Sequence, residues 1–124
     1  MHLIHLMLLD MMDGFKANPH PNYNIAFLFF AGEVIGLLGS KYYTDNPSIG
    51  LDRIKFVLNL DLMGSGDKGF AVVNAKLFPK YLAQLKAAND QLKKPLSPIK
   101  ERGEAANSDH YWFSKNGVPA FFIY

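Results

Sequence analysis

The sequence predicts an α/β fold with a mainly parallel central sheet flanked by helices. Segments of strand and helix character alternate along the chain, and the two longest strand candidates are residues 25–30, which are apolar throughout, and residues 54–60, which are apolar apart from Lys55 and Asn59. Strands of parallel sheets are buried on both faces, so they appear in a sequence as unbroken apolar runs. The chain has 124 residues and shows no internal repeat, so we expect one domain over residues 1–124.

Composition limits the classes of function. The chain is 49% hydrophobic and 19% charged, which is typical of a globular protein and argues against disorder. A net charge of +2 with scattered basic residues argues against nucleic acid or an anionic membrane as partner. No apolar run reaches the ~18 residues of a membrane span. The absence of cysteine excludes disulfides, thiolate metal sites and a cysteine nucleophile.

The start of the chain does not resemble an export signal. Residues 1–12 are apolar but contain His2, His5 and Asp10, and they lack Lys and Arg. A secretory signal needs a positively charged start and a cleavage site with small residues. We therefore expect a soluble chain and assign it no compartment, and a longer, exported parent protein stays open.

Hydrophobic spacing and turn residues define the elements of the first half. Apolar residues recur at helical intervals near the start, and a segment with two prolines separates them from the first apolar run. In order, we predict a helix over 2–16, a loop over 18–24, a buried strand over 25–30, and a helix from Glu33 to Tyr42 that ends at Asp45-Asn46-Pro47.

The second half repeats the alternation. Asn74 and either Ser108 or Asp109 are candidate helix caps, and Gly117 is a stop signal. In order, we predict a buried strand over 54–60, a loop over 64–67, a strand over 70–73, a helix with the apolar stripe Leu77, Tyr81, Leu85, Ala88 and Leu92, a connection over 96–103 with one short strand, a short helix to Phe113, and a strand over 119–124.

Two acids follow the predicted buried strands. Glu33 comes shortly after residues 25–30, and Asp61 directly follows residues 54–60. Ligands of open α/β sheets gather at the carboxyl ends of the strands, so two parallel strands would bring both carboxylates to one rim. There they could bind a metal or act in acid–base chemistry. On spacing alone, two acids placed at helix starts by the helix dipole are the slightly better interpretation.

Three segments, two of which contain these acids, resemble motifs of the M28 family of zinc peptidases. Residues 31–40, AGEVIGLLGS, resemble the family's Gly-Glu-Glu-x-Gly-Leu-x-Gly-Ser signature, and residues 59–64, NLDLMG, are similar to its Leu-Asp-Met-x-Gly strand end. Residues 107–113, NSDHYWF, followed by NGVPA at 116–120, resemble its Ser-Asp-His-x-x-Phe…Gly-x-Pro-Ala segment. The motifs occur in the family's order, and the resemblance runs from about residue 8 to residue 124.

The resemblance implies a fold, an activity and a set of site residues. The fold would be a truncated zinc-exopeptidase (phosphorylase/hydrolase-like) fold, and the activity metal-assisted hydrolysis of N-terminal peptide bonds, usually with two zinc ions. It places Glu33 as the general base, Asp61 as a zinc ligand, and Asp109 as an acid that supports the site or orients the substrate. Glutaminyl cyclases share the fold and the motifs, so cyclisation is a related reading.

The chain departs from the family pattern at the metal ligands. The second Glu of the signature is normally a ligand, and Val34 occupies that position. The family's His-x-Asp motif, its bridging Asp and its last His ligand have no counterpart in residues 1–124, so we expect a partial domain. Of the usual ligands only Asp61 remains, whereas a catalytic zinc site keeps about three. His2 and His5 could join Asp61, although two solvated side chains at a frayed end are the simpler interpretation.

We therefore predict a truncated relative of a zinc aminopeptidase that is inactive as this chain and binds zinc weakly or not at all. The partner would be a peptide substrate or a peptide N-terminus. The alternative is a non-catalytic domain of the same fold that binds peptide ends or associates with itself. Missing parts of the family sheet should leave apolar surface open, so we expect a homo-oligomer.

Overall fold

The computed structural model describes residues 2–20, 22–64 and 67–124 of the chain. The side chains of His2 and Leu3, and two positions of the loop predicted over 64–67, lie outside the described part. The helices are α1 (His2–Ala17), α2 (Leu38–Asp45), α3 (Pro79–Asp90) and α4 (His110–Lys115), with a short 3-10 turn η1 at Leu51–Arg53. The strands are β1 (Val57–Leu60), β2 (Phe70–Val73), β3 (Ile99–Glu101) and β4 (Ala120–Ile123).

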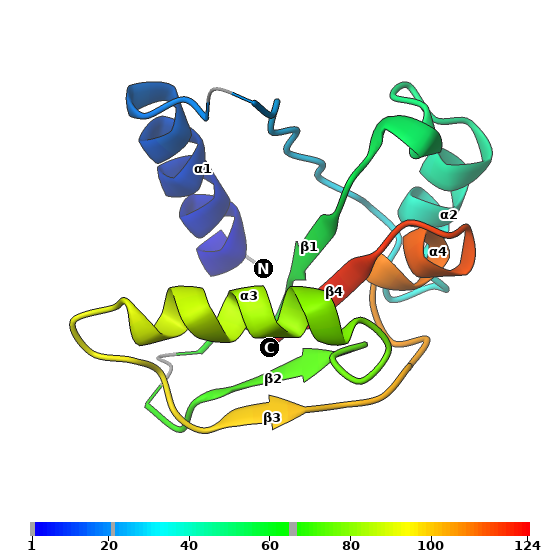
Figure 1. Ribbon diagram of the computed structural model, residues 1–124. Helices are drawn as coiled ribbons and strands as arrows, with labels where there is room; N and C mark the ends of the chain where they lie inside the picture. Colours follow the sequence, from blue (N-terminus) through cyan, green and yellow to red (C-terminus); the bar gives the residue numbers. More distant parts are fainter. Residues whose placement is uncertain (1, 21, 65–66) are drawn as a thin grey trace.

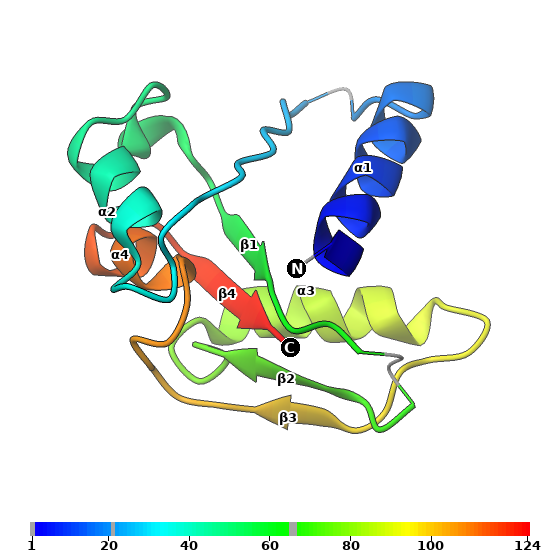
Figure 2. The same ribbon diagram turned by 180° about the vertical axis from the view of Figure 1, so that it is seen from behind.

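The strands form one sheet with the order β1-β4-β2-β3. β1 pairs with β4 in parallel, and β2 pairs with β3 in parallel, while β2 and β4 run antiparallel. α3 lies along one side of this sheet, and α2 and α4 pack together beside the ends at which β1 and β4 begin (Figures 1 and 2). The prediction of a largely parallel α/β fold flanked by helices is confirmed.

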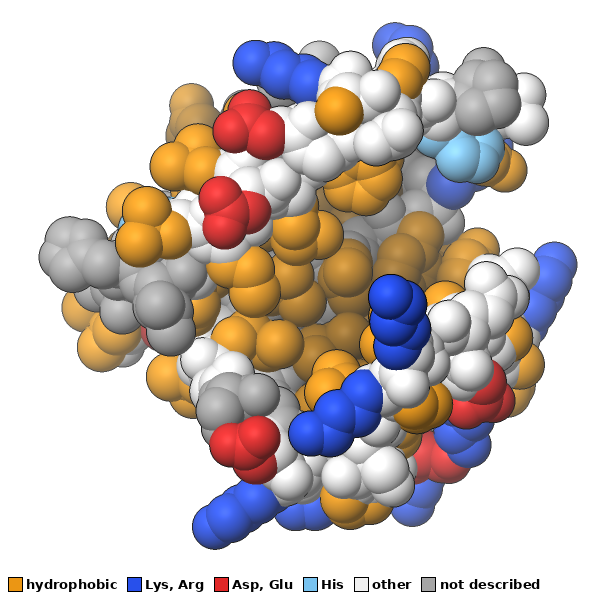
Figure 3. Space-filling model, turned by 90° about the vertical axis from the view of Figure 1, so that its left-hand side faces the viewer, with side chains coloured by type: hydrophobic (Ala, Val, Ile, Leu, Met, Phe, Trp, Pro, Cys, Tyr) orange, Lys and Arg blue, Asp and Glu red, His pale blue; other side chains and the backbone are white. Residues whose placement is uncertain are grey.

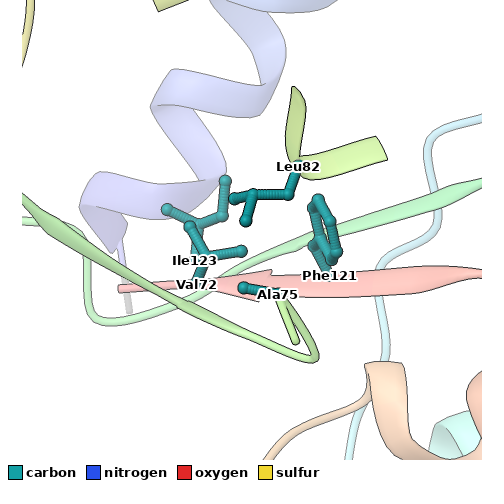
Figure 4. Packing of buried hydrophobic residues seen from close by; sticks show 5 residues of the cluster. All are labelled: Val72, Ala75, Leu82, Phe121 and Ile123. Atoms are coloured by element: carbon teal, nitrogen blue, oxygen red, sulfur yellow. The ribbon is translucent and has the colours of Figure 1, made fainter. Parts of the chain in front are cut away.

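The core has two parts because the central strand β4 is covered on both faces. Phe121 and Ile123 point toward α3 and pack with Val72, Ala75 and Leu82 (Figure 4). The alternate residue Ala120 packs on the other face with Phe113 and Val118. All four residues of β4 are buried, as the apolar run at the end of the chain predicts for a strand between two layers.

The prediction of a buried central strand over residues 25–30 is wrong. The segment is not part of the sheet, and Ile25 and Phe29 are 44% and 49% exposed. In the described part of the chain, the backbone of Tyr23 to Phe30 makes no hydrogen bond. An apolar run shows only that side chains favour burial, whereas a strand also needs a neighbour to pair with, and none is present here.

The position of β1 also differs from the prediction. The strand is shorter than residues 54–60 and lies at the edge of the sheet, with side chains that are half-buried or exposed. The mostly apolar character of residues 54–60 therefore identified a strand but did not place it at the centre of the sheet. Among the described residues, no helix combines the length and the hydropathy needed to cross a bilayer.

Two helix starts differ from the sequence prediction. α2 begins at Leu38 instead of Glu33, because Gly36 and Leu37 have φ angles of 110° and 58°, which a helix cannot accommodate. α3 begins at Pro79, where proline suits the first turn, and Asn74 is not its cap. The Asn74 side chain instead donates a hydrogen bond of 3.0 Å to the Ala120 carbonyl.

The apolar stripe predicted for α3 faces two environments. Tyr81 and Leu85 pack on the core, together with the buried Leu82 that the stripe did not include. Ala88 and Leu92 are exposed and instead line a groove beside the carboxyl ends of β1 and β4. The helical spacing was therefore correct, but only the first turns of α3 lie against the sheet.

Candidate active-site rim

Three carboxylates lie at the carboxyl end of β1. Asp61 follows the last residue of β1, and its backbone N–H donates to the Ile123 carbonyl of β4 at 3.3 Å. Its Oδ1 accepts a hydrogen bond of 2.8 Å from the Leu62 N–H. The side chain is half-buried.

Glu33 reaches the same rim from a turn. The Glu33 carbonyl accepts hydrogen bonds from Gly36 N–H at 3.1 Å and Leu37 N–H at 3.0 Å, which close the chain into a compact loop before α2. Burial raises the pKa of the Glu33 carboxyl, and the negative charges of Asp61 and Asp109 raise it further. The structure thus brings Glu33 and Asp61 together, although the segment before Glu33 is not a strand.

Asp109 is the third acid of this rim, which we call the acidic rim (Glu33, Asp61 and Asp109). It precedes α4 but makes no side-chain capping hydrogen bond, so the predicted cap is wrong for Asp109. Burial raises the pKa of its carboxyl, the neighbouring Ser40 hydroxyl opposes this shift, and the charge of Asp61 adds to it. The Ser40 hydrogen is donated to the Leu37 carbonyl at 3.1 Å, and Asp109 Oδ1 is buried without a hydrogen-bond partner among the described residues.

Among the side chains that the structure describes, the remaining candidates do not join the acidic rim. Val34 is 88% exposed, so its isopropyl group faces solvent and offers no ligand atom. The His5 ring packs against Phe29 with centroids 5.5 Å apart. The side chain of His2 lies outside the described part. His110 is fully buried and stacks on Phe122 at 5.5 Å, as a structural residue would.

Two residues near the rim were not predicted to have a role there. Ser40, at the end of the AGEVIGLLGS segment, is completely buried beside Asp109. Asn59 Nδ2 donates a hydrogen bond of 2.7 Å to Ser108 Oγ, which is buried as well. Both Asn59 and Ser40 lie inside segments with family resemblance, but nothing in their spacing distinguishes a buried polar contact from a solvated side chain.

A family model shows where this chain belongs. The model of peptidase family M28 matches residues 5–123. The chain is a member of peptidase family M28. It is 30% identical over 110 residues to leupeptin-inactivating enzyme 1 of Streptomyces exfoliatus, and it covers 23% of that protein.

Solved structures agree with this membership. A zinc aminopeptidase from Bacillus subtilis matches 76% of this chain with a TM-score of 0.63 and 24% identity, and it supports the fold. An aminopeptidase from an Aneurinibacillus strain matches the same share with a TM-score of 0.57 and 29% identity. The chain spans 24% and 23% of the length of these two structures.

The described residues of this M28 chain do not by themselves fit a resident zinc ion. No group of three or more His, Asp or Glu side chains within residues 2–20, 22–64 and 67–124 is arranged to hold a metal. Zinc sites need about three protein ligands. The charges of Glu33 and Asp109 favour a cation nearby but do not replace the missing ligands.

Proposed function

We propose that this chain supplies the general-base part of an M28 aminopeptidase site, which hydrolyses N-terminal peptide bonds in the complete domain. The observation that carries the proposal is the convergence of Glu33, Asp61 and Asp109 at one rim of the sheet, within electrostatic reach of one another. Groups with raised pKa values and a shared charge environment are typical of acid–base sites.

Each acid has a separate proposed role. Glu33 is half-buried and partly open to solvent, so it can accept a proton from a water molecule at the rim. Asp61 is the proposed zinc ligand, with one oxygen fixed by the Leu62 N–H. Asp109 would attract the positively charged amino terminus of a peptide and orient it toward Glu33.

The 124-residue chain alone is expected to lack aminopeptidase turnover. One ligand cannot hold zinc tightly, and a single carboxylate does not fix the geometry that a catalytic site needs. After purification without chelator and dialysis, metal analysis should find zinc well below one ion per chain. An aminoacyl-anilide assay should show hydrolysis no faster than buffer with zinc. Turnover that disappears with chelator and with Glu33→Gln would contradict this expectation.

Restoring a carboxylate at Val34 should change zinc binding but not activity. Because this side chain is almost completely exposed, Val34→Glu should alter the free energy of unfolding by no more than about 0.5 kcal/mol. The new carboxylate restores the ligand type that the M28 signature has at this position, so calorimetric titration should show tighter zinc binding than wild type. Val34→Gln, a neutral control of the same shape, should not. Turnover by Val34→Glu would show that the chain lacks fewer ligands than we infer.

The alternative function is self-association, and exposed apolar surface favours it. Figure 3 shows a hollowed face with hydrophobic side chains on its floor and both positively and negatively charged side chains around it. A groove of about 580 Å³ lies between α3 and the carboxyl ends of β1 and β4. The unpaired segment 25–30 adds backbone groups that another strand can bind.

A second copy of the chain is the occupant we expect. Residues 22–32 contain no charge and no proline, so two copies of the segment can pair antiparallel without repulsion. Light scattering at micromolar concentration should therefore give a mass of at least two chains. Phe29→Lys should shift the mass toward one chain, because it places like charges near the paired centre. The exposed Leu77→Lys, outside the segment, is the matched control. A monomeric wild type would overturn self-association.

Peptide binding separates the two functions. If the acidic rim recognises peptide amino termini, a fluorescent peptide with a free N-terminus should bind, and its N-acetylated form should bind less tightly. Asp109→Asn should reduce this difference, because it removes one of the charges that attract the amino group. Equal binding of both peptides would argue against recognition of peptide ends.

A further inference from the structure

Asp109 occupies a position that is unfavourable for a carboxylate. One of its oxygens is buried without a hydrogen-bond partner in the described part of the chain, and the charges of Asp61 and Glu33 lie nearby. Desolvation and like-charge repulsion both oppose this placement. Neighbouring contacts must therefore hold the carboxylate where it is.

The backbone before Asp109 provides little of that support. The chain leaves β3 at one edge of the sheet and arrives at α4, which packs near β1 and β4 (Figure 1). Its last backbone hydrogen bonds to the sheet region are those of Arg102 and Gly103. Residues 104–107 make no backbone–backbone hydrogen bond with a described residue.

The next anchor is a side-chain hydrogen bond at Ser108. Asn59 Nδ2 donates to Ser108 Oγ at 2.7 Å, across 49 positions of sequence. Asn59 is fixed in β1, where it pairs with Phe122, and it lies two positions before Asp61. Ser108 is buried and directly precedes Asp109. The bond therefore connects the strand that carries Asp61 to the residue before Asp109.

We propose that Asn59 and Ser108 are positioning residues that hold Asp109 at the acidic rim beside Asp61. The functional importance of this role rests on the proposed function, because it matters only if Asp109 serves the site. The bond fixes where the connection from β3 enters α4. Without it, the Asp109 carboxylate would move outward to solvent, where hydration relieves both desolvation and repulsion.

Nuclear magnetic resonance on the 124-residue chain tests the position of Asp109 without any activity. In Asn59→Ala and in Ser108→Ala, the side-chain carboxyl carbon of Asp109 and the amides of residues 104–110 should shift in the same direction. The double variant should shift no further, because either substitution removes the whole bond. Each single variant should raise the unfolding equilibrium constant about three- to tenfold, and the double variant should not multiply these factors.

Two controls separate positioning from general loss of stability. Asn89→Ala removes a different side-chain tie, to Leu96 at 3.0 and 3.1 Å, and should destabilise the chain without moving the Asp109 resonances. Ser108→Thr keeps the hydroxyl and should retain them. Unmoved Asp109 resonances in both alanine variants, or additive effects in the double variant, would overturn the proposal. A missing peptidase activity would not, because these measurements need no turnover.

Discussion

Replacing Phe113 with alanine is expected to lower the free energy of unfolding by about 3–5 kcal/mol. Phe113 is 1% exposed and lies at the centre of the core on the α4 side of the sheet. Its ring contacts those of Phe30 and Tyr43, with centroids 6.1 and 5.7 Å apart. Alanine would leave a cavity between α2, α4 and the segment that leads to Glu33.

The same substitution should disturb the acidic rim, since Phe113 joins the elements that carry Glu33 and Asp109. Denaturant unfolding followed by far-UV circular dichroism measures the stability. Phe29→Ala is the matched control: Phe29 is 49% exposed, so its removal should cost less than about 1 kcal/mol. A loss at Phe113 no larger than at Phe29 would show that the packing around α4 is not a fixed core.

A second large effect is expected from His110 as the pH falls. Burial lowers the pKa of His110 from 6.5 to about 4, and the backbone of Ala105 and Ser108 opposes this shift more weakly. The ring is 0% exposed, and neither of its nitrogens has a hydrogen-bond partner among the described residues. Below pH 6.5 the unfolded chain therefore binds a proton that the folded chain does not.

The direction in which stability changes with pH follows from proton linkage. The unfolded state binds more protons between pH 6.5 and pH 4, so stability falls as the pH is lowered through this range. The loss approaches ~3 kcal/mol, since one unit of pKa shift corresponds to 1.36 kcal/mol. The raised pKa values of Glu33 and Asp109 act in the opposite direction, because their protonation favours the folded state.

Comparison with His110→Phe isolates the histidine. Phenylalanine keeps an aromatic ring against Phe122 and removes both unpaired nitrogens and the proton uptake. The difference in unfolding free energy between the two proteins should change by about 3 kcal/mol from pH 7 to pH 4, because the carboxylate contributions cancel. A parallel pair of pH profiles for wild type and His110→Phe would contradict the assignment.

The sequence predicted an element correctly where the residues of that element and its ends were enough to specify it. An apolar run was enough to predict the strand at 70–73, and turn residues were enough to predict the end of α2 at Asp45. The stop at Gly117 required only a glycine, which adopts a φ of 84° there. The acids of the rim were also identifiable, because each lies in a segment with several features of the M28 motifs.

Predictions failed where a property depends on a neighbour. Residues 25–30 have the composition of a central strand, but pairing requires another strand, and the described residues supply none. α2 starts at Leu38 and not at Glu33, because residues 33–37 form a turn in which Gly36 and Leu37 have positive φ angles. Asn74 and Ser108 do not act as the predicted helix caps, because their side chains form hydrogen bonds with residues of distant strands.

The sequence by itself determined the α/β class, the M28 membership and the identity of the three acids, since these depend on residue types and their order. The tertiary structure decided which strands are central, which apolar surface stays open, and how close Glu33, Asp61 and Asp109 lie. It also decided the raised pKa values of Glu33 and Asp109 and the bond between Asn59 and Ser108. Burial, strand pairing and electrostatics join residues far apart in the chain, so local patterns cannot specify them.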